Sequence, residues 1–307
     1  MNTLESSEEI VWIESEDGLP LDGVVIRPVG IAAKPIAVVH VHGFTSRFSL
    51  TTHVLVGRHL ARHGFTSVSG NNRGYSFGKN TQRRGTQVMI GAAWERFDEC
   101  PLDIGAWVAF IVGLGFDEVV LLGHSFGAPK VVWYQAERQD SRVRGLICAS
   151  PGPAFLVGYS ELANSDVAQP RPFDMHYLID PAVIDLAERM VHEGRGQDLL
   201  PWGSVGSITL SAQTCLDRAA GNRATFDVFG VAMAAPAVAH VRCPLLVFFG
   251  TEEAATSGGP TELDLIRRKA VSASRVDTHI IPGADHMYTQ RTTEVAELIA
   301  GWLKSSL

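Results

Sequence analysis

The chain has 307 residues, of which 46% are hydrophobic, and a formal net charge of −7. This length and composition allow one large core, either as one domain or as one domain with an insertion. The acidic balance argues against a nucleic-acid groove or an anionic membrane surface, because no cluster of Lys and Arg offsets it. Four widely separated cysteines and an N-terminus without an apolar signal core predict a soluble cytoplasmic protein with reduced thiols. The sequence leaves a homodimer open.

The first half of the chain predicts a hairpin followed by alternating strands and helices. Two alternating β-type runs at residues 9–28 are joined by Asp17-Gly18, a hairpin signal. The near-continuous apolar run at 35–41 is typical of a strand buried on both faces of a parallel sheet. We interpret the polar, glycine-containing stretch at 75–97 as a loop with one turn of helix. The remaining expected elements are helices at 50–63, 101–113 and 128–138, and strands at 65–69, 119–122 and 143–149.

Alternation of strand and helix lapses between residues 154 and 241 and then returns. Helix-like pieces at 181–193 and 211–219 make this long stretch an insertion rather than a loop. After it we expect strands at 245–250 and 276–281 and helices at 261–273 and 294–304. The order predicts an α/β fold with a doubly wound, mostly parallel sheet, whose core comprises residues 1–153 and 242–307.

The central stretch of the sequence is VVLLGHSFGAPK at residues 119–130. In it an apolar strand meets Gly123-His124-Ser125-Phe126-Gly127, and a segment of helical character follows. A serine on such a sharp strand-to-helix turn projects its hydroxyl away from the backbone, and glycines two residues to either side let strand and helix approach. Ser125 is therefore the candidate nucleophile.

Candidates for the base and the acid follow the last two predicted strands. His286 lies in the loop after the final strand, where its ring can reach over the sheet edge toward Ser125. The loop after residue 249 reads Gly250-Thr251-Glu252-Glu253, without an aspartate, so we expect Glu253, with Glu252 as the alternative, to orient the imidazole. Asp285 is too close in sequence to orient His286 well, and we interpret it as a brace of the loop.

An oxyanion formed at Ser125 needs two backbone N–H donors. One candidate is Phe126, directly after the nucleophile, and the other is Phe44, in the loop after the first buried strand. Gly43 lets that loop pass close to a substrate. We interpret His42 as a brace of the same loop.

These motifs resemble the α/β-hydrolase superfamily over nearly the whole chain. His42-Gly43, Arg73-Gly74, the elbow pentapeptide and Asp285-His286 occur in that family's order of nucleophile, acid and base. The resemblance implies that 154–241 is a helical cap. The chain departs from the family in having glutamate where the acid is usually aspartate, and Asn71-Asn72 before Arg73. Asn72-Arg73-Gly74 and the run at 193–196 are similar to relatives grouped with siderophore esterases.

The leading hypothesis is a serine hydrolase that cleaves a small-molecule carboxylic ester or thioester through an acyl-enzyme, without a cofactor. A C–C bond hydrolase, an acyltransferase, a lyase or a cyclase on the same triad is the first alternative, and a non-catalytic ligand-binding protein is the second. His40-x-His42 and His59-x-x-x-His63 have metal-ligand spacing. We interpret them as packed or solvated histidines, because no carboxylate partner is visible in the sequence, and expect no metal.

Overall fold

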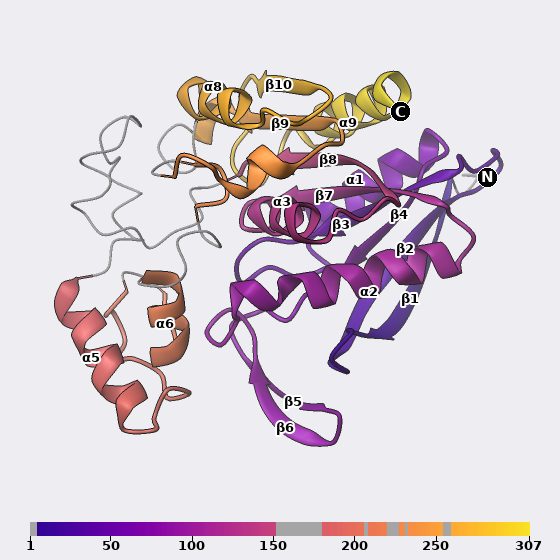
Figure 1. The fold of residues 1–307 in the computed structure, drawn as a ribbon. Coiled ribbons are helices and arrows are strands. Elements are labelled where there is room, and N and C mark those ends of the chain that lie inside the picture. Colours follow the sequence, from indigo (N-terminus) through magenta and orange to yellow (C-terminus); the bar gives the residue numbers. More distant parts are fainter. Residues whose placement is uncertain (1–4, 152–179, 206–207, 220–226, 231–232, 254–258) are drawn as a thin grey trace.

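An eight-stranded sheet forms the centre of the protein (Figure 1). The computed structural model describes residues 5–151, 180–205, 208–219, 227–230, 233–253 and 259–307. The strand order is β1-β2-β4-β3-β7-β8-β9-β10; β2 pairs antiparallel with β1 and β4, and the other neighbouring strands are parallel. The strands are β1 (Ser6–Glu14), β2 (Pro20–Pro28), β3 (Ile36–Val41), β4 (Thr66–Gly70), β7 (Glu118–His124), β8 (Val143–Ala149), β9 (Leu245–Gly250) and β10 (Val276–Ile281).

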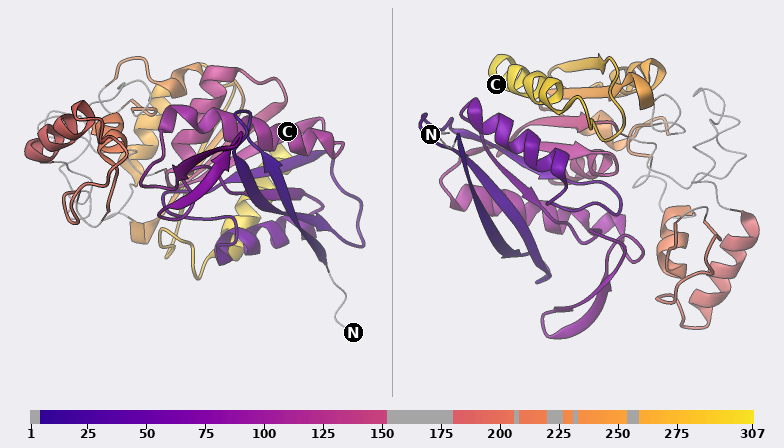
Figure 2. Two further views of the ribbon diagram at one scale, coloured as in Figure 1. Left: turned by 90° about the horizontal axis from the view of Figure 1, so that it is seen from below. Right: turned by 180° about the vertical axis from the view of Figure 1, so that it is seen from behind.

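Helices cover both faces of the sheet, so the expected α/β class with a doubly wound, mostly parallel sheet is confirmed. One apolar cluster packs α2, α3 and α8 against one face, and a second packs α1 and α9 against the other (Figure 2). Strands β3 and β9 are buried throughout, which explains their near-continuous apolar sequences. The helices are α1 (Thr51–Arg62), α2 (Cys100–Gly113), α3 (Gly127–Arg138), α8 (Pro260–Lys269) and α9 (Thr292–Ser306). No helix in the described ranges is long and apolar enough to cross a membrane.

The stretch at 75–97, expected as a loop, instead contains a separate two-stranded hairpin. Strands β5 (Lys79–Arg83) and β6 (Thr86–Ile90) pair antiparallel. Arg84 and Gly85 join them with φ angles of 50° and 81°, the left-handed backbone that a tight hairpin turn requires. The prediction failed because both strands are mostly polar and lack a clear apolar alternation. One 3₁₀ turn, Phe97–Glu99, follows the hairpin.

The predicted insertion contains two helices that have an apolar cluster of their own. Helices α5 (Pro181–His192) and α6 (Ala212–Ala219) lie beside each other and apart from the sheet (Figure 1). The Asp180 side chain begins α5 by accepting a hydrogen bond from the N–H of Ala182, at 2.9 Å. Both expected helices are thus present, whereas residues 152–179, 206–207, 220–226 and 231–232 of the stretch lie outside the described ranges. The domain boundaries stay a prediction.

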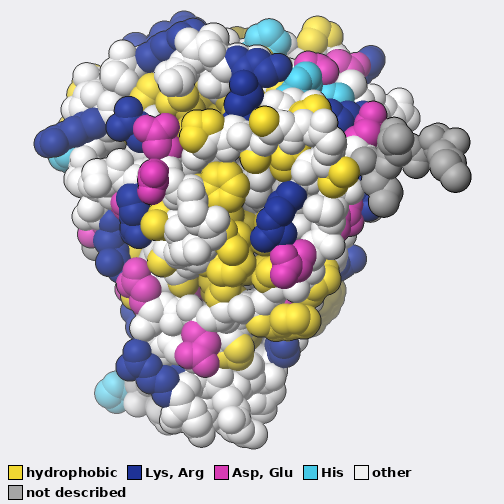
Figure 3. Space-filling view, turned by 90° about the vertical axis from the view of Figure 1, so that its right-hand side faces the viewer, with side chains coloured by type: hydrophobic (Ala, Val, Ile, Leu, Met, Phe, Trp, Pro, Cys, Tyr) yellow, Lys and Arg dark blue, Asp and Glu magenta, His cyan; other side chains and the backbone are white. Residues whose placement is uncertain are grey.

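The edge strand β1 combines apolar and charged side chains. Ile10 and Trp12 are exposed by 50% and 73%, and Glu8 and Glu9 stand beside them in the sequence. Figure 3 shows the corresponding side of the molecule, where hydrophobic side chains are interspersed with acidic and basic ones. Charged side chains on an edge strand oppose pairing with another sheet.

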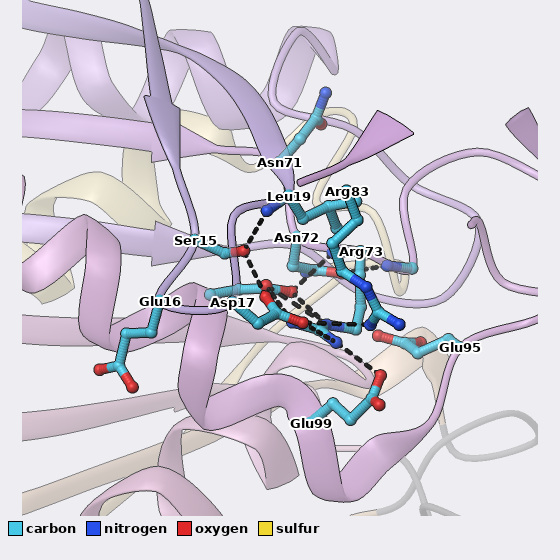
Figure 4. Close-up of polar contacts among 12 residues, drawn as sticks. Ser15, Glu16, Asp17, Leu19, Asn71, Asn72, Arg73, Arg83, Glu95 and Glu99 are labelled. Carbon is cyan, nitrogen blue, oxygen red and sulfur yellow. Dashed lines mark hydrogen bonds and ion pairs between the residues drawn. The ribbon is translucent and has the colours of Figure 1, made fainter. Parts of the chain in front are cut away.

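A buried arginine ties the loop after β4 to helix α2 and to the first hairpin (Figure 4). Arg73 Nη2 donates to Asp103 Oδ1 at 2.9 Å and to Asp17 Oδ1 at 3.1 Å, and Nη1 donates to Glu99 Oε2 at 2.5 Å. Burial opposes the charged guanidinium, but the surrounding carboxylates outweigh it and raise the pKa of Arg73. Asp103 also accepts the Arg73 backbone N–H at 2.7 Å. This cluster fixes the loop at residues 71–74.

Replacement Asp103→Asn should lower the free energy of unfolding by about 3 kcal/mol, because it leaves the buried Arg73 charge partly uncompensated while Asp17 and Glu99 remain. Urea unfolding measures this change. The control is Asp264→Asn, which breaks an exposed ion pair with Arg267. Its free energy of unfolding should fall by less than about 1 kcal/mol. Equal losses in the two variants would contradict a structural role for the buried cluster.

Candidate active site

The sharp turn between β7 and α3 presents Ser125 at the carboxyl edge of the sheet. Its φ angle is 54°, a left-handed conformation that is strained for a residue with a side chain. A Cβ atom on Gly123 would come within 2.3 Å of the Gly127 carbonyl oxygen, and one on Gly127 within 2.1 Å of Val41 O. Both glycines are therefore required by the close passage of strand and helix, as the sequence predicted.

Ser125, His286 and Glu253 meet at this edge, although 161 positions separate the first two. The Ser125 Oγ atom lies 3.0 Å from His286 Nε2, and Glu253 Oε2 lies 2.9 Å from His286 Nδ1. A carboxylate can only accept, so His286 Nδ1 carries a proton that it donates to Glu253. In the neutral ring, Nε2 then has its lone pair directed at the serine hydroxyl. This arrangement can remove a proton from Ser125.

Glu253 is fully buried and is held by donors from two neighbouring strand ends. Its Oε1 atom accepts the N–H of Gly250 at 2.6 Å and the hydroxyl of Ser150 at 2.6 Å. Ser150 has only one hydroxyl proton, which it gives to Glu253, so the Tyr288 hydroxyl donates in turn to Ser150 Oγ. Burial, followed by the Glu253 charge, raises the pKa of Tyr288 well above its ordinary value and keeps this donor protonated.

The two other acidic residues close in sequence to the site, Glu252 and Asp285, make other contacts. Glu252, the alternative acid, is exposed, and its side chain accepts from the Thr251 hydroxyl at 3.4 Å. Asp285 accepts the backbone N–H groups of Met287 and Thr289 at 3.1 and 2.9 Å, which makes it the loop brace that the sequence indicated. Of the candidate carboxylates, Glu253 is the one that contacts His286.

The loop after β3 passes directly beside the serine. A Cβ on Gly43 would lie 2.8 Å from Ser125 Cβ and 3.2 Å from its Oγ, so only glycine permits this approach. His42 Nδ1 donates to the Gly43 carbonyl at 2.8 Å, and its Nε2 accepts the Asn72 N–H at 3.2 Å. Both ring nitrogens are thus used in bracing the loop. Phe44 follows at this point of closest approach.

Helix α6 lies over the two phenylalanines predicted to supply the oxyanion donors. The Arg218 guanidinium stands 4.7 Å from the centre of the Phe44 ring and 4.8 Å from that of Phe126. The same helix is tied to the core, since Arg96 Nε donates to Asp217 Oδ2 at 3.0 Å. The described part of the insertion therefore contacts Phe44 and Phe126, which directly follow Gly43 and Ser125 in the sequence, and brings a positive charge to their rings.

A family model described as the alpha/beta hydrolase family matches residues 38–298 of the chain. The chain belongs to that family. Among solved structures, Est1E from Butyrivibrio proteoclasticus with bound ferulic acid is 17% identical over 96% of this chain and 98% of its own, with a TM-score of 0.65. DcsB with a substrate analogue is 14% identical over 98% and 99%, with a TM-score of 0.65. The Pyrococcus furiosus esterase Pf2001 is 15% identical over 98% and 93%, with a TM-score of 0.58.

A comparison with curated proteins by sequence gives no match. At these identities the solved structures support the fold of this alpha/beta hydrolase, and the narrower resemblance to siderophore esterases stays a prediction.

Several residues that support the site in this alpha/beta hydrolase were missed by sequence reasoning. Ser150 and Tyr288 hold the Glu253 side chain, as described above. Lys130, on the elbow helix, is fully buried, pairs with Glu95 and donates to Asn72 Oδ1 at 3.1 Å. The only sequence signal for Lys130 is a lysine on the apolar side of a predicted helix. This buried pair joins the elbow helix to the loops at 71–74 and 91–95.

A cluster of three buried histidines lies near the sheet edge that carries Ser125 and His286 in this hydrolase. The His53 ring centre is 4.0 Å from that of His40 and 5.6 Å from that of His124. His124 Nε2 donates to the backbone carbonyl of His286 at 2.8 Å and so helps to position that loop. Burial lowers the pKa of His40 and of His124 to about 3, and that of His53 well below its ordinary value. The three rings are neutral in the folded protein at neutral pH.

The histidine cluster should make the protein sensitive to acid. An unfolded histidine takes up a proton near pH 6.5, whereas the folded His40 and His124 resist it until about pH 3. Between about pH 6.5 and pH 3 the unfolded state therefore binds more protons than the folded state. As the pH falls through this range, each of these histidines lowers the free energy of unfolding by up to about 1.4 kcal/mol per pH unit. Urea unfolding of the wild type and of His40→Leu at pH 7 and pH 5 tests this. The variant should lose less stability between the two pH values; an unchanged difference would contradict the argument.

Proposed function

We propose that this protein is a serine hydrolase that cleaves a carboxylic ester or thioester of a small molecule through an acyl-enzyme. The observation that carries the proposal is the continuous hydrogen-bonded line from Ser125 through His286 to the buried Glu253. Membership of the alpha/beta hydrolase family supports a hydrolytic reaction at this site. The Pyrococcus furiosus esterase among the similar solved structures agrees with this class of reaction.

In the proposed acylation step, His286 Nε2 takes the Ser125 hydroxyl proton while Oγ attacks the substrate carbonyl carbon. The imidazolium that forms lies 2.9 Å from the Glu253 carboxylate, which stabilises its charge. His286 then gives the proton to the leaving alcohol or thiol, and the acyl group stays on Ser125. In deacylation, His286 activates a water molecule that attacks the acyl carbon and releases the acid.

We propose that the backbone N–H groups of Phe44 and Phe126 bind the oxyanion of the tetrahedral intermediate. The argument is positional, because Phe126 directly follows Ser125 and Phe44 follows Gly43, which stands against the serine. We further propose that residues 154–241 form a cap that selects the substrate, since the described helix α6 places Arg218 over both phenylalanine rings. A positive charge there favours the negative charge that develops during acyl transfer.

The nucleophile assignment predicts that Ser125→Ala lowers the hydrolysis of short p-nitrophenyl esters at least about a thousandfold, because no attacking oxygen remains. A fluorophosphonate probe should label the wild type once, at Ser125, as peptide mass spectrometry can determine. The Ser125→Ala protein should show the thermal unfolding of a folded chain. Full turnover in this variant, or a label at another residue, would reject the proposal.

The acid assignment predicts that Glu253→Gln lowers kcat about a hundredfold or more, since a neutral amide neither fixes the imidazole tautomer nor stabilises the imidazolium. Glu252→Gln is the matched control, because the neighbouring glutamate is exposed, and it should keep activity near that of the wild type. Steady-state kinetics with one ester substrate compares the two. Loss of rate in the Glu252 variant alone would show that the acid is misassigned.

A further inference from the structure

The structure brings a carboxylate to a pair of histidines that the sequence leaves without one. His59 lies in the last turn of α1, and His63 follows directly after that helix. Glu297 of α9 comes from near the opposite end of the chain, and its Oε1 atom lies 2.8 Å from His59 Nε2 and 3.2 Å from His63 Nε2. The expectation that no carboxylate accompanies this spacing is therefore wrong.

We propose that His59, His63 and Glu297 form a binding site for a divalent transition-metal ion, with Zn²⁺ as the preferred ion. The three ligand atoms all lie within 4.8 Å of one another. Zn²⁺ bonds of about 2.0–2.1 Å in a tetrahedron place ligand atoms roughly 3.4 Å apart. The separations of 2.8 and 3.2 Å around the shared carboxylate oxygen are close to that value. Two imidazoles and a carboxylate leave the fourth position to water.

The surroundings of the three side chains suit a cation. The histidine side chains are exposed by only 12% and 22%, so the helices restrict them, whereas Glu297 is exposed by 55% and leaves the site open to solvent. The end of α1 adds the negative partial charge of its terminal carbonyl groups. On the face of the molecule shown in Figure 3, histidine and acidic side chains lie close together near the upper edge.

Lys304 opposes metal binding at the same place. Its Nζ atom donates to His63 Nδ1 at 3.0 Å, which keeps the proton of that ring on Nε2, the atom that would bind the metal. A bound ion requires the Nε2 proton to leave and the lysine side chain to turn away. Lys304 therefore weakens the site, and its removal should strengthen binding.

A bound ion would join two helices that pack on the same face of the sheet. His63 and Glu297 are 234 positions apart, so the ion would link the first helix of the chain to the last. Because the unfolded chain does not hold these ligands together, metal binding should stabilise the folded state. The proposed role is structural, and it is independent of the proposed hydrolysis.

Zn²⁺ titration of the chelator-treated protein against a chromophoric competitor tests the site. The wild type should bind one ion per chain, and Glu297→Gln and His63→Ala should each weaken binding at least about tenfold, since loss of a ligand should cost no less than loss of its supporting contacts. Lys304→Met should bind more tightly. The control His279→Ala removes an exposed histidine on β10 and should bind like the wild type. Thermal unfolding with and without Zn²⁺ should show a stabilisation that Glu297→Gln loses.

Far-ultraviolet circular dichroism of each metal-free variant verifies that it is folded, which is expected because Glu297 and Lys304 are surface residues. Absence of binding to the wild type would overturn the proposal. Unchanged binding in both Glu297→Gln and His63→Ala would also overturn it, because the ion would then be held elsewhere. Weaker binding by Lys304→Met would contradict the proposal as well.

Discussion

The geometry of the candidate site depends on a single buried charge. The Glu253 carboxylate has no exposed surface, and burying an ionised group is unfavourable unless hydrogen bonds or an opposite charge compensate for it. Gly250 and Ser150 provide donors to one oxygen, and His286 donates to the other. The same contacts that make the burial tolerable also fix the imidazole in the orientation that faces Ser125. Removing the charge would therefore free the His286 ring as well as the Glu253 side chain.

The loops that surround this charge are held by two further buried ion pairs. Arg73 with Asp103 fixes the loop after β4, and Lys130 with Glu95 joins the elbow helix to the loop before α2. Buried pairs of this kind contribute little net stability compared with apolar contacts, but breaking one leaves an uncompensated charge. They thus restrict the loops to one arrangement. Asn72 connects the Lys130 pair to the loop after β3, since it accepts from Lys130 and also donates to the His42 carbonyl.

The sequence was most informative where one backbone geometry or one apolar pattern leaves few alternatives. The glycines around Ser125 predicted the turn, and strands β8, β9 and β10 have the bounds that the sequence predicted. Prediction failed where partners come from distant segments, or where a strand lacks an apolar pattern. Ser150 gave no sign that it would hold Glu253, and the polar strands β5 and β6 lack the alternation that identifies a hairpin. The pairing of His59 and His63 with Glu297 depends on the packing of α1 against α9, which no local pattern encodes.

The residues of the candidate site are held by different parts of the fold. Ser125, His286 and Glu253 all follow strands of one sheet, and neighbouring strand ends hold them through backbone and side-chain hydrogen bonds. Arg218 reaches the same place from α6, which has its own small apolar cluster and is joined to the core through contacts such as Arg96 with Asp217. A change in α6 can therefore alter what lies above the serine without moving the three residues below it. Under the proposed function, the chemistry would therefore depend on the sheet and the selection of substrate on the insertion.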